Sequence, residues 1–590
     1  MITLQNFLMP DPVICTEHPL YFHATGDFAL SQSSGEIWLK AGAKLLFDSY
    51  FNLFNLTKWH RACVLDGLFA EIRGEGRVEI QVIQVIPEQS WEILHCEPVT
   101  LVAGTPHVAD LSHYPGRATQ GLIYVEIKAL DAGGARITGG RFCTGSVPGA
   151  LPRLAVSITT FKREQQVRET VARLETFLGT FAFGDRVHVQ VVDNGASAGI
   201  AASPRVTPFV NPNYGGAGGF ARGLLEAEKA GFTHCLFMDD DASFHMENIA
   251  RAYVFLALAR APRAAVAGAM INNTHKWAMW ENGAWFDGSC HPQFCGTDLR
   301  SREAVFKMEH ASALSRPATL YGGWWFFAFA IAEVRHHPFP FFVRGDDISF
   351  SLMNDFEITT LNGVVSFQDD FAEKENAQTL YLDLRNHLIH HLVCDRLARG
   401  PLGTGKIALR FMMRSMLRFH YESAAAQLLA WEDVMRGPAF FDENIDMAAR
   451  RATIREMMQT ETWGDLEPGQ LAQRRRLTRI SRPWRTRLGI VTLNGHLVPF
   501  SRCFWDRIVL TMADRGIVYP AFGAAEITYL NATSDKGYTV TQSKRAFFRL
   551  CWKMLKTLLR FRREFAALRA AYRSGYDAQT TRAYWEKKLG

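Results

Sequence analysis

Three consecutive aspartates, Asp239 to Asp241, directly follow a largely apolar stretch at 234–238. Such a stretch is typical of a buried strand, so the carboxylates are predicted at a strand end, where they repel one another and are costly to desolvate. In an extended segment Asp239 and Asp241 point to the same side, so together they can hold one Mg²⁺ or Mn²⁺ and leave positions for diphosphate oxygens. The alternative is a solvated acidic turn in which Asp241 caps the next helix.

A glycine-rich stretch, Asn211 to Gly223, is the second candidate. Glycines at the start of a helix let backbone N–H groups approach an anion closely. The stretch lacks the Lys-Ser/Thr of a P-loop and the spacing of a dinucleotide-binding motif, so neither an ATPase nor a dinucleotide-binding protein is predicted. A tight helix entry without a ligand is the alternative.

A second acidic pair, Asp346 and Asp347, precedes another predicted helix. One carboxylate can act as a general base toward an acceptor hydroxyl while the other caps the helix. The alternative is that both simply interact favourably with the N-terminal end of the helix dipole.

Aromatic residues gather between Tyr321 and Phe329, with Trp324 and Trp325 adjacent. Sugars present C–H faces that stack on indole rings, so this run can form an acceptor platform. A buried strand explains the phenylalanines equally well, although the two tryptophans must then face opposite ways. Glu281 is predicted to face the same acceptor, with a surface turn as the simpler alternative.

Strand-like and helix-like stretches alternate around these motifs. The strand-like stretches are 154–158, 187–192 and 234–238, and helices are predicted near 164–178 and 218–230. This alternation is typical of a parallel α/β sheet.

Polar residues follow each of the three predicted strands: Thr159 to Arg163, Asp193 to Gly195, and Asp239 to Asp241. In such sheets ligands bind beyond the carboxyl ends of the strands. Three strand ends are therefore expected to converge on one site.

At 590 residues the chain is too long for a single core, so several domains are expected. Alternating stretches at 78–86 and 122–128 predict a β-sandwich or barrel in residues 1–150. The α/β unit is assigned to 151–400, and 401–590 is predicted to be mainly helical.

Composition favours a folded, cytoplasmic protein. The chain is 48% hydrophobic and 21% charged, and its net charge of +6 is too small to indicate a nucleic-acid partner. Ten scattered cysteines without a CxxC pair are interpreted as mostly buried, reduced thiols. The N-terminal residues do not resemble a signal peptide, and no segment is apolar enough to span a membrane.

A basic segment lies near the C-terminus. Between Lys544 and Arg563 there are eight Lys or Arg and no acidic residue. The apolar partners expected on the same helix are Phe548, Trp552, Leu555, Leu559 and Phe561. A basic amphipathic helix can lie on an anionic bilayer, here the inner face of the plasma membrane, and the alternatives are packing on the protein's own core or on another subunit. Nucleic acid is not predicted, because the aromatic residues do not interleave with the charges.

Taken in order, these motifs resemble glycosyltransferase family 2 and its GT-A fold, a Rossmann-like mixed sheet. More narrowly, the chain resembles the galactofuranosyltransferases that polymerise the mycobacterial cell-wall galactan. The matching segments are Ser49–Phe54, Thr160–Arg163, Val192–Gly195, Asn213–Gly223, Tyr321–Trp325, Arg344–Asp347 and Leu384–Asn386.

The resemblance implies an inverting transfer of galactofuranose from UDP-galactofuranose to a glycan or lipid-linked acceptor, dependent on Mn²⁺ or Mg²⁺. It assigns Asp347 as the catalytic base and Asp239 and Asp241 as metal ligands. The expected donor-binding residues are Arg163, Asp193, Asn213, Gly216, Asp239 and Asp240, and those at the acceptor are Trp324, Trp325, Asp346 and Glu281. A homo-oligomer acting in cell-surface polysaccharide synthesis is expected by the same analogy.

Two departures from the family pattern leave alternatives open. The histidine expected to complete the metal site is missing from 364–370, and His387 comes too late in the chain to match it, so water, Gln368 or a nearby carboxylate is the third-ligand candidate. Gly345 and 348–350 replace an expected tryptophan and an acidic-aromatic sequence. The alternatives are a related transferase using another nucleotide sugar, such as a UDP-hexopyranose or dTDP-rhamnose, and a catalytically silent carbohydrate-binding scaffold.

Overall fold

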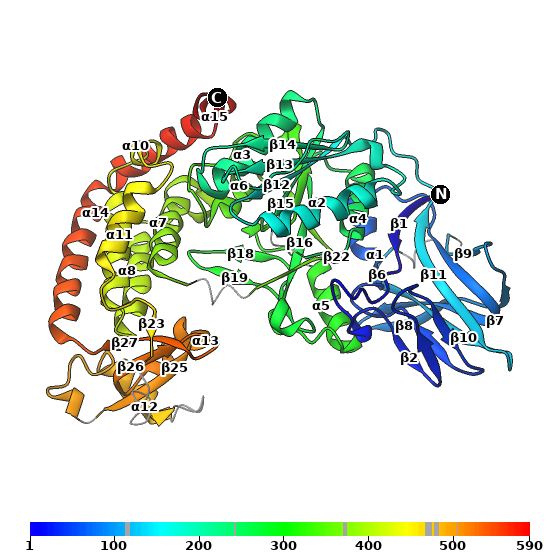
Figure 1. Cartoon of the computed structure of the whole chain (residues 1–590), viewed down its shortest axis with the longest axis horizontal. Helices are drawn as coiled ribbons and strands as arrows, with labels where there is room; N and C mark the ends of the chain where they lie inside the picture. The colour runs from blue at the N-terminus through cyan, green and yellow to red at the C-terminus, as the bar shows by residue number, and fades with distance from the viewer. Residues whose placement is uncertain are drawn as a thin grey trace.

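The structure is a computed structural model that describes residues 1–112, 119–240, 243–314, 316–369, 375–466, 475–476, 483–503 and 505–590. Asp241 lies outside these residues, so its predicted role as a metal ligand stays a prediction. The chain forms a β-rich N-terminal part, an α/β centre and a C-terminal part containing long helices, which follow one another across the molecule (Figure 1).

The long strand β7 (Phe69–Ile86) organises the N-terminal part. Its first half pairs with β11 (Ala135–Thr144) and β9 (His107–Asp110), and its second half pairs with β10 (Leu122–Ala129) and β8 (Ser90–Leu101). The shorter strands are β1 (Ile2–Asn6), β2 (His23–Thr25), β3 (Phe28–Leu30), β4 (Ile37–Leu39), β5 (Lys44–Leu46) and β6 (Phe54–Asn55). All the pairings between these strands are antiparallel, as the alternating sequence predicts.

A mixed eight-stranded sheet forms the centre. Four strands are parallel neighbours: β14 (Val206–Val210), β13 (Val187–Asp193), β12 (Leu154–Thr160) and β15 (His234–Asp239). The sheet continues through β21 (Phe327–Ala330), β16 (Ala264–Asn272) and β17 (Met279–Glu281), with β22 (Glu357–Gln368) also on β16. The predicted α/β class is confirmed, and β21 makes the sheet mixed because it runs antiparallel to β15 and β16.

Helices connect these strands and cover the sheet (Figure 1). Those packed on its strands are α2 (Glu164–Leu178), α3 (Gly215–Lys229) and α4 (Glu247–Leu258). Three more helices follow in this part of the chain, α5 (Arg302–Leu314), α6 (Asp346–Asn354) and α7 (Ala377–Val393), and α7 packs mainly against helices of the C-terminal part. A small sheet of β18 (Ala284–Phe286), β19 (Cys290–Pro292) and β20 (Leu320–Tyr321) lies beside them.

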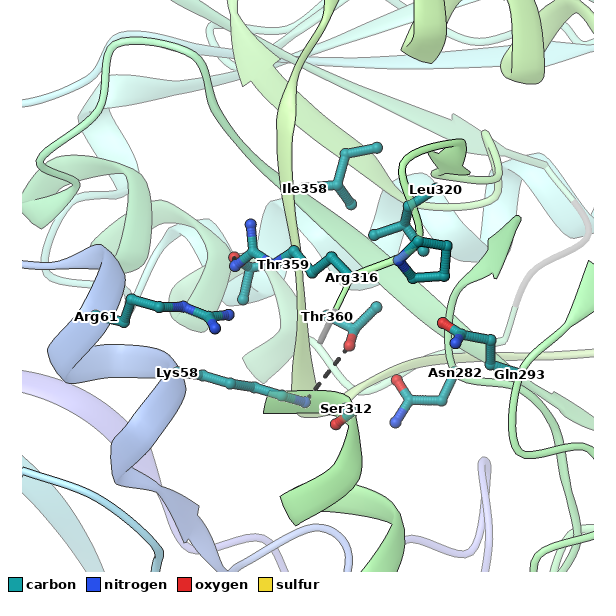
Figure 2. A pocket seen from close by; sticks show the side chains of 11 residues that line it. Lys58, Arg61, Asn282, Gln293, Ser312, Arg316, Leu320, Ile358, Thr359 and Thr360 are labelled. Atoms are coloured by element: carbon teal, nitrogen blue, oxygen red, sulfur yellow. Dashed lines mark hydrogen bonds between the residues drawn. The ribbon is translucent and has the colours of Figure 1, made fainter. Parts of the chain in front are cut away.

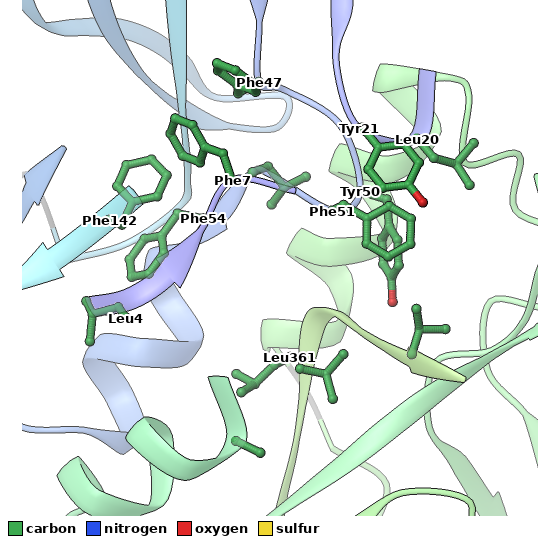
Figure 3. Close-up of a cluster of buried hydrophobic side chains, with 14 of the residues drawn as sticks. Leu4, Phe7, Leu20, Tyr21, Phe47, Tyr50, Phe51, Phe54, Phe142 and Leu361 are labelled. Atoms are coloured by element: carbon green, nitrogen blue, oxygen red, sulfur yellow. The ribbon is translucent and has the colours of Figure 1, made fainter. Parts of the chain in front are cut away.

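The N-terminal and central parts share one hydrophobic core. Tyr50 and Phe51, from the motif Ser49–Phe54, are fully buried, and Leu361 of β22 belongs to the same cluster (Figure 3). Nearby, the buried guanidinium of Arg251 on α4 donates to the carbonyl oxygens of Asn6, Phe51 and Asn362, at 2.9, 3.0 and 2.8 Å. The motif Ser49–Phe54 therefore joins the two parts.

The C-terminal part contains helices and one unexpected sheet. The short helix α1 (Leu56–Ala62) belongs to the N-terminal part. The helices of the C-terminal part are α8 (Pro401–Leu417), α9 (Tyr421–Val434), α10 (Ala439–Glu443), α11 (Ala448–Met457), α12 (Pro483–Val491), α13 (Met512–Arg515), α14 (Lys544–Gln579) and α15 (Arg582–Leu589). Strands β23 (Gly464–Asp465), β24 (Arg475–Arg476), β25 (Asp506–Thr511), β26 (Ala524–Leu530) and β27 (Lys536–Thr541) form the sheet. The prediction of a mainly helical part missed this sheet, whose strands are between two and seven residues long.

All ten cysteines are free thiols, as expected, but they are less buried than predicted. The buried ones are Cys15, Cys63, Cys143, Cys235 and Cys394; Cys551 is half-buried, and Cys96, Cys290, Cys295 and Cys503 are exposed. Among the residues described, no helix is long and apolar enough to cross a membrane.

Helix α3 lies unusually close to β12, and two glycines make this approach possible. A Cβ on Gly219 would lie 2.2 Å from Cγ2 of Thr159, and one on Gly223 would lie 1.8 Å from Oγ of Ser157. Because the glycines are four apart on a helix and their partners two apart on a strand, both contacts fall on facing sides of the two elements. Part of the glycine-rich motif thus serves helix–strand packing.

Gly223→Ala is expected to lower the free energy of unfolding by about 1–3 kcal/mol, because the added methyl overpacks this contact. Urea denaturation followed by circular dichroism measures the change. Gly149→Ala is the matched control, since a Cβ there would meet nothing within 4 Å. Equal midpoints for the two variants would contradict the packing role.

Candidate active site

A cavity of about 740 Å³ opens at the carboxyl ends of the parallel strands. Its walls come from the ends of β12 and β15, the start of α3, the loop and first turn of α6, the small sheet, and α7. The predicted residues that line it are Arg163, Asn213, Gly216, Asp239, Asp240, Glu281, Trp324, Trp325, Asp346 and Asp347. The structure therefore brings together the predicted residues except Asp193 and the undescribed Asp241.

Asp240 is held at the strand ends by two neighbours. Its Oδ2 accepts a hydrogen bond from Thr160 Oγ1 at 2.6 Å, and its Oδ1 lies 3.5 Å from Nη1 of Arg163. The first and last residues of the matching segment Thr160–Arg163 thus both contact Asp240. Arg163 places a partly exposed positive charge at this side of the cavity.

Asp193 does not line the cavity. Its carboxylate accepts hydrogen bonds from the backbone N–H groups of Gly195 and Ala198, at 2.8 and 2.7 Å, and so shapes its own loop. The neighbouring Asn194 lines the cavity instead and donates to the carbonyl oxygen of Gly215 at 3.0 Å. Donor binding by Asp193 stays a prediction.

The start of α3 touches the loop that precedes the second acidic pair. Gly215 has a φ of +71°, and a Cβ there would lie 2.1 Å from the carbonyl oxygen of Phe342. The N–H of Ala217 donates to that same oxygen at 3.1 Å. At Gly216 the position of a Cβ is 3.4 Å from Oδ2 of Asp346. Asp346, predicted at the acceptor, therefore lies beside a residue predicted at the donor.

Three carboxyl groups in the cavity, those of Asp346, Asp347 and Glu281, have raised pKa values. Burial, followed by repulsion from Asp347 and Asp239, raises the pKa of Asp346 well above its usual range. Burial raises the pKa of Asp347 to about 6, although the N–H of Ile348 stabilises its charged form. Burial and the charge of Asp347 raise the pKa of Glu281 to about 8. Glu281 is only 6% exposed, so it does not lie in a surface turn.

The loop before Asp346 has a strained backbone. Phe342 and Arg344 have φ values of +76° and +73°, which are uncommon for residues other than glycine. Asn386 on α7 donates to the carbonyl oxygens of Val343 and Arg344, at 3.0 and 2.6 Å. Its neighbour Arg385 donates to that of Phe341 at 2.5 Å. The motif Leu384–Asn386 therefore holds this loop in place.

Gly345 completes the same loop and explains one departure from the family pattern. Its φ is +78°, and a Cβ there would lie 2.7 Å from Nε2 of His390. Both the backbone conformation and the space thus disfavour a larger side chain at this position.

The two tryptophans line the cavity but are mostly buried. Trp324 packs edge-on against Phe220 and Phe350, and its Nε1 is buried without a hydrogen-bond partner. The Nε1 of Trp325 donates to the carbonyl oxygen of Gly268 at 2.8 Å. They belong to different hydrophobic clusters, consistent with the expectation that they face opposite ways.

Several residues at the cavity were not predicted from the sequence. Asp383 and His387 come from α7, and Arg451 comes from α11 in the C-terminal part. Oδ1 of Asp383 lies 4.0 Å from Nη1 of Arg344. Burial lowers the pKa of His387 to about 3, so this imidazole is neutral at physiological pH. Nothing in a single sequence marks these positions, because only the fold brings the helices to the site.

Carboxylate oxygens dominate one side of the cavity, and they suit a hard divalent cation such as Mg²⁺ or Mn²⁺. The repulsion that raises the pKa of Asp346 arises partly from Asp239, which also lines the cavity. Gln368, a candidate third ligand, does not line the cavity, but its buried Nε2 has no hydrogen-bond partner. The adjacent Phe367 forms a β-bridge with Ser243, which follows Asp241 by two residues in the sequence.

Two other hollows are less suited to a reaction. A cavity of about 20 Å³ lies at the buried ion pair of Lys58 and Glu309, with Lys58 also donating to Thr360 (Figure 2). It has room for water but not for a sugar. A hollow of about 990 Å³ on the N-terminal part, with Trp38 at its edge, is wider but is not lined by a group of buried carboxylates.

Comparison with known proteins supports the class of enzyme. The galactofuranosyltransferase GlfT2 of Mycolicibacterium smegmatis is 24% identical over 616 aligned positions, covering 93% of this chain and 89% of the relative. The chain resembles galactofuranosyltransferases over most of its length. The enzyme of the same name from Mycobacterium tuberculosis is 26% identical over 68% of this chain and 66% of its own. These relatives confirm the predicted resemblance and the predicted class, a glycosyltransferase. No family model matches the sequence.

Solved structures are less similar. The mannosyltransferase PcManGT from Pyrobaculum calidifontis, in complex with GDP-Man and Mn²⁺, is 16% identical and covers 53% of this chain and 84% of its own, with a TM-score of 0.28. Mannosyl-3-phosphoglycerate synthase from Rubrobacter xylanophilus is 11% identical over 41% of this chain and 74% of its own, with a TM-score of 0.26. These likenesses are too low to argue from.

Glu281→Gln is expected to stabilise the metal-free protein at alkaline pH. The folded state raises the pKa of this carboxyl from 4.5 to about 8, so its ionisation opposes folding as pH rises through that window. The gain in unfolding free energy should grow from pH 4.5 to about 8 and reach on the order of 1–3 kcal/mol.

Urea denaturation across this pH range, with a chelator present, measures the gain. Glu443→Gln is the control, because that side chain is 64% exposed. A gain that does not change with pH would show that Glu281 is ionised at little cost in the folded protein.

Proposed function

We propose that the protein is an inverting, metal-dependent glycosyltransferase that transfers galactofuranose from UDP-galactofuranose to a glycan or lipid-linked acceptor in cell-surface polysaccharide synthesis. The observation that carries the proposal is the convergence, in one cavity, of Asp239 and Asp240, the glycine-rich start of α3, and Asp346 and Asp347. Similarity to the named galactofuranosyltransferases over most of the chain supports it.

The donor side is proposed around Arg163, Asn213, Gly216 and the acidic triplet. Bound Mn²⁺ or Mg²⁺ would neutralise charge that develops on the departing diphosphate. Arg163 adds a positive charge, and the start of α3 offers backbone N–H groups where Gly216 leaves the surface open. Asp239 and Asp241 are the proposed metal ligands, and Gln368 or water completes the set in place of histidine.

Asp347 is the proposed base on the acceptor side. A pKa of about 6 leaves this carboxylate mostly ionised at neutral pH yet basic enough to accept a proton from a sugar hydroxyl. Glu281, whose pKa is raised partly by the charge of Asp347, and the unpartnered Nε1–H of Trp324 are the groups proposed to orient that hydroxyl. Direct displacement from the face opposite the leaving UDP inverts the anomeric carbon.

A different nucleotide sugar is the second candidate, favoured by the altered loop at Gly345, because this loop also contacts Gly215 and Gly216 on the proposed donor side. Release of nucleotide from a panel of UDP-galactofuranose, UDP-galactopyranose and dTDP-rhamnose with Mn²⁺ separates the two. Turnover of UDP-galactofuranose alone is expected. Turnover only with another sugar rejects the donor assignment, and no turnover with any donor favours the silent-scaffold alternative.

Asp347→Asn is expected to lower kcat by about 10²–10⁴-fold, because it removes the base and keeps the shape of the side chain. Asp185→Asn is the control, since that side chain is 94% exposed. In the wild type, kcat should fall as pH drops through about 6, where Asp347 becomes protonated. An unchanged kcat in Asp347→Asn would show that Asp347 is not the catalytic base.

We also propose that the protein sits on the inner face of the plasma membrane through α14. Phe548, Trp552, Leu555 and Leu559 are 49, 58, 46 and 57% exposed and recur at helical spacing among basic residues. Phe561, the fifth apolar residue expected on this helix, faces the core instead: it is fully buried and packs edge-on against Trp431. The helix therefore has one apolar face on the core and another toward solvent. A homo-oligomer stays a prediction from the resemblance.

Trp552→Ser is expected to weaken binding to vesicles containing anionic phospholipid by about 10-fold. The reason is that the variant loses roughly 1.5 kcal/mol or more of binding free energy from burial of the indole ring. Cosedimentation with vesicles measures the affinity, which should also fall with added salt. Trp38→Ser, which removes another exposed tryptophan, is the control. Equal vesicle binding by both variants would exclude the exposed apolar face of α14 as the membrane-binding surface.

A further inference from the structure

Two histidines and a glutamate form a cluster in the N-terminal part, on a different sheet from the candidate active site. His95 and Glu97 lie on β8, and His107 lies on β9. None of the three lines the cavity that holds Asp239 and Asp347. Their ligand atoms, one per residue, all lie within 4.8 Å of one another.

The course of the chain explains why these residues meet. β9 pairs with the first half of β7, and β8 pairs with its second half, so each belongs to a different half of the sheet. At the junction Gly76 has a φ of +105°, and the bridge between Val102 and Thr105 closes the turn from β8 to β9. The cluster therefore lies where the two halves of the N-terminal sheet meet.

Strand alternation selects which side chains point into the cluster. Residues two apart on a strand share a face, so His95 and Glu97 lie on one side of β8 and Cys96 on the other. Cys96 is exposed and free. The site thus offers two imidazoles and one carboxylate, without a thiolate.

The geometry suits a bound cation. Nε2 of His95 lies 3.3 Å and Nε2 of His107 lies 3.8 Å from the same oxygen, Oε2 of Glu97. These separations are close to those between neighbouring ligands of a tetrahedral ion with bonds of about 2.0–2.2 Å.

Both Nε2 atoms are buried, and neither makes a hydrogen bond, since their contacts with Oε2 of Glu97 lack hydrogen-bond geometry. Leaving a buried polar nitrogen without a partner is costly, and a metal–nitrogen bond would remove that cost for both imidazoles at once. Glu97 is 48% exposed on its side chain, so an ion can reach the cluster from solvent.

We propose that His95, Glu97 and His107 bind a divalent ion of the zinc class, with water in the remaining position. Imidazole nitrogens favour Zn²⁺ and the later transition metals over Mg²⁺, which prefers oxygen ligands. The bound ion joins β8 to β9 and stabilises the junction between the two halves of the sheet. This site is separate from the oxygen-lined cavity, which suits Mn²⁺ or Mg²⁺.

Isothermal titration of untagged, metal-stripped full-length protein with Zn²⁺, in excess Mg²⁺, tests the proposal. One Zn²⁺ per chain is expected. Zn²⁺ affinity should fall by at least about 10-fold in His95→Ala, His107→Ala and Glu97→Gln. Loss of a residue that only hydrogen-bonds to a metal ligand already lowers affinity by about 10-fold, and loss of a ligand should cost at least as much. His60→Ala, which removes an exposed histidine, should bind as the wild type does.

Two further measurements keep the outcomes distinct. Co²⁺ should give a visible absorption spectrum that the wild type shows and His95→Ala lacks, and Zn²⁺ should raise the Tm of the wild type but not of Glu97→Gln. Circular dichroism establishes that each variant is folded. The proposal is overturned if no stoichiometric Zn²⁺ binds, or if binding survives His95→Ala and disappears in Asp239→Asn.

Discussion

Asp346 and Asp347 are adjacent in the chain and lie near Asp239 and Glu281, so four carboxyl groups compete for ionisation in one cavity. Burial and mutual repulsion act in the same direction and favour the protonated forms. Arginines and backbone N–H groups compensate only part of this cost. The remaining part is a driving force for binding a cation, and it also keeps Asp347 a stronger base than an exposed aspartate.

Such a group of acids is useful only if its backbone stays in place. Phe342, Arg344 and Gly345 all have left-handed conformations, which for the two non-glycine residues cost on the order of 1–3 kcal/mol each. Hydrogen bonds from Arg385 and Asn386 to this loop, together with the contact of Gly215 on Phe342, offset the cost. The position of the acids is therefore determined by helices on both sides of the loop.

Local patterns predicted the central sheet well. The predicted strand at 187–192 became Val187–Asp193 and the predicted helix at 164–178 became Glu164–Leu178, because apolar periodicity reports burial directly. What the sequence could not reveal depends on contacts between distant segments: Arg451 reaches the cavity from α11, and Asp193 turns its carboxylate into its own loop. Phe561 shares its helix with four exposed apolar residues, and only tertiary packing shows that it faces the core.

Arg251 connects the N-terminal and central parts through buried hydrogen bonds. A fully buried guanidinium whose hydrogen bonds end on carbonyl oxygens from three separate segments cannot slide or rotate without leaving a charge unsolvated. The N-terminal β-structure is therefore joined to the central sheet by a shared core and by buried hydrogen bonds. A polymer that contacted both parts would meet two binding surfaces whose separation is set by this joint. Its position along the protein would therefore depend on the fold as well as on the cavity.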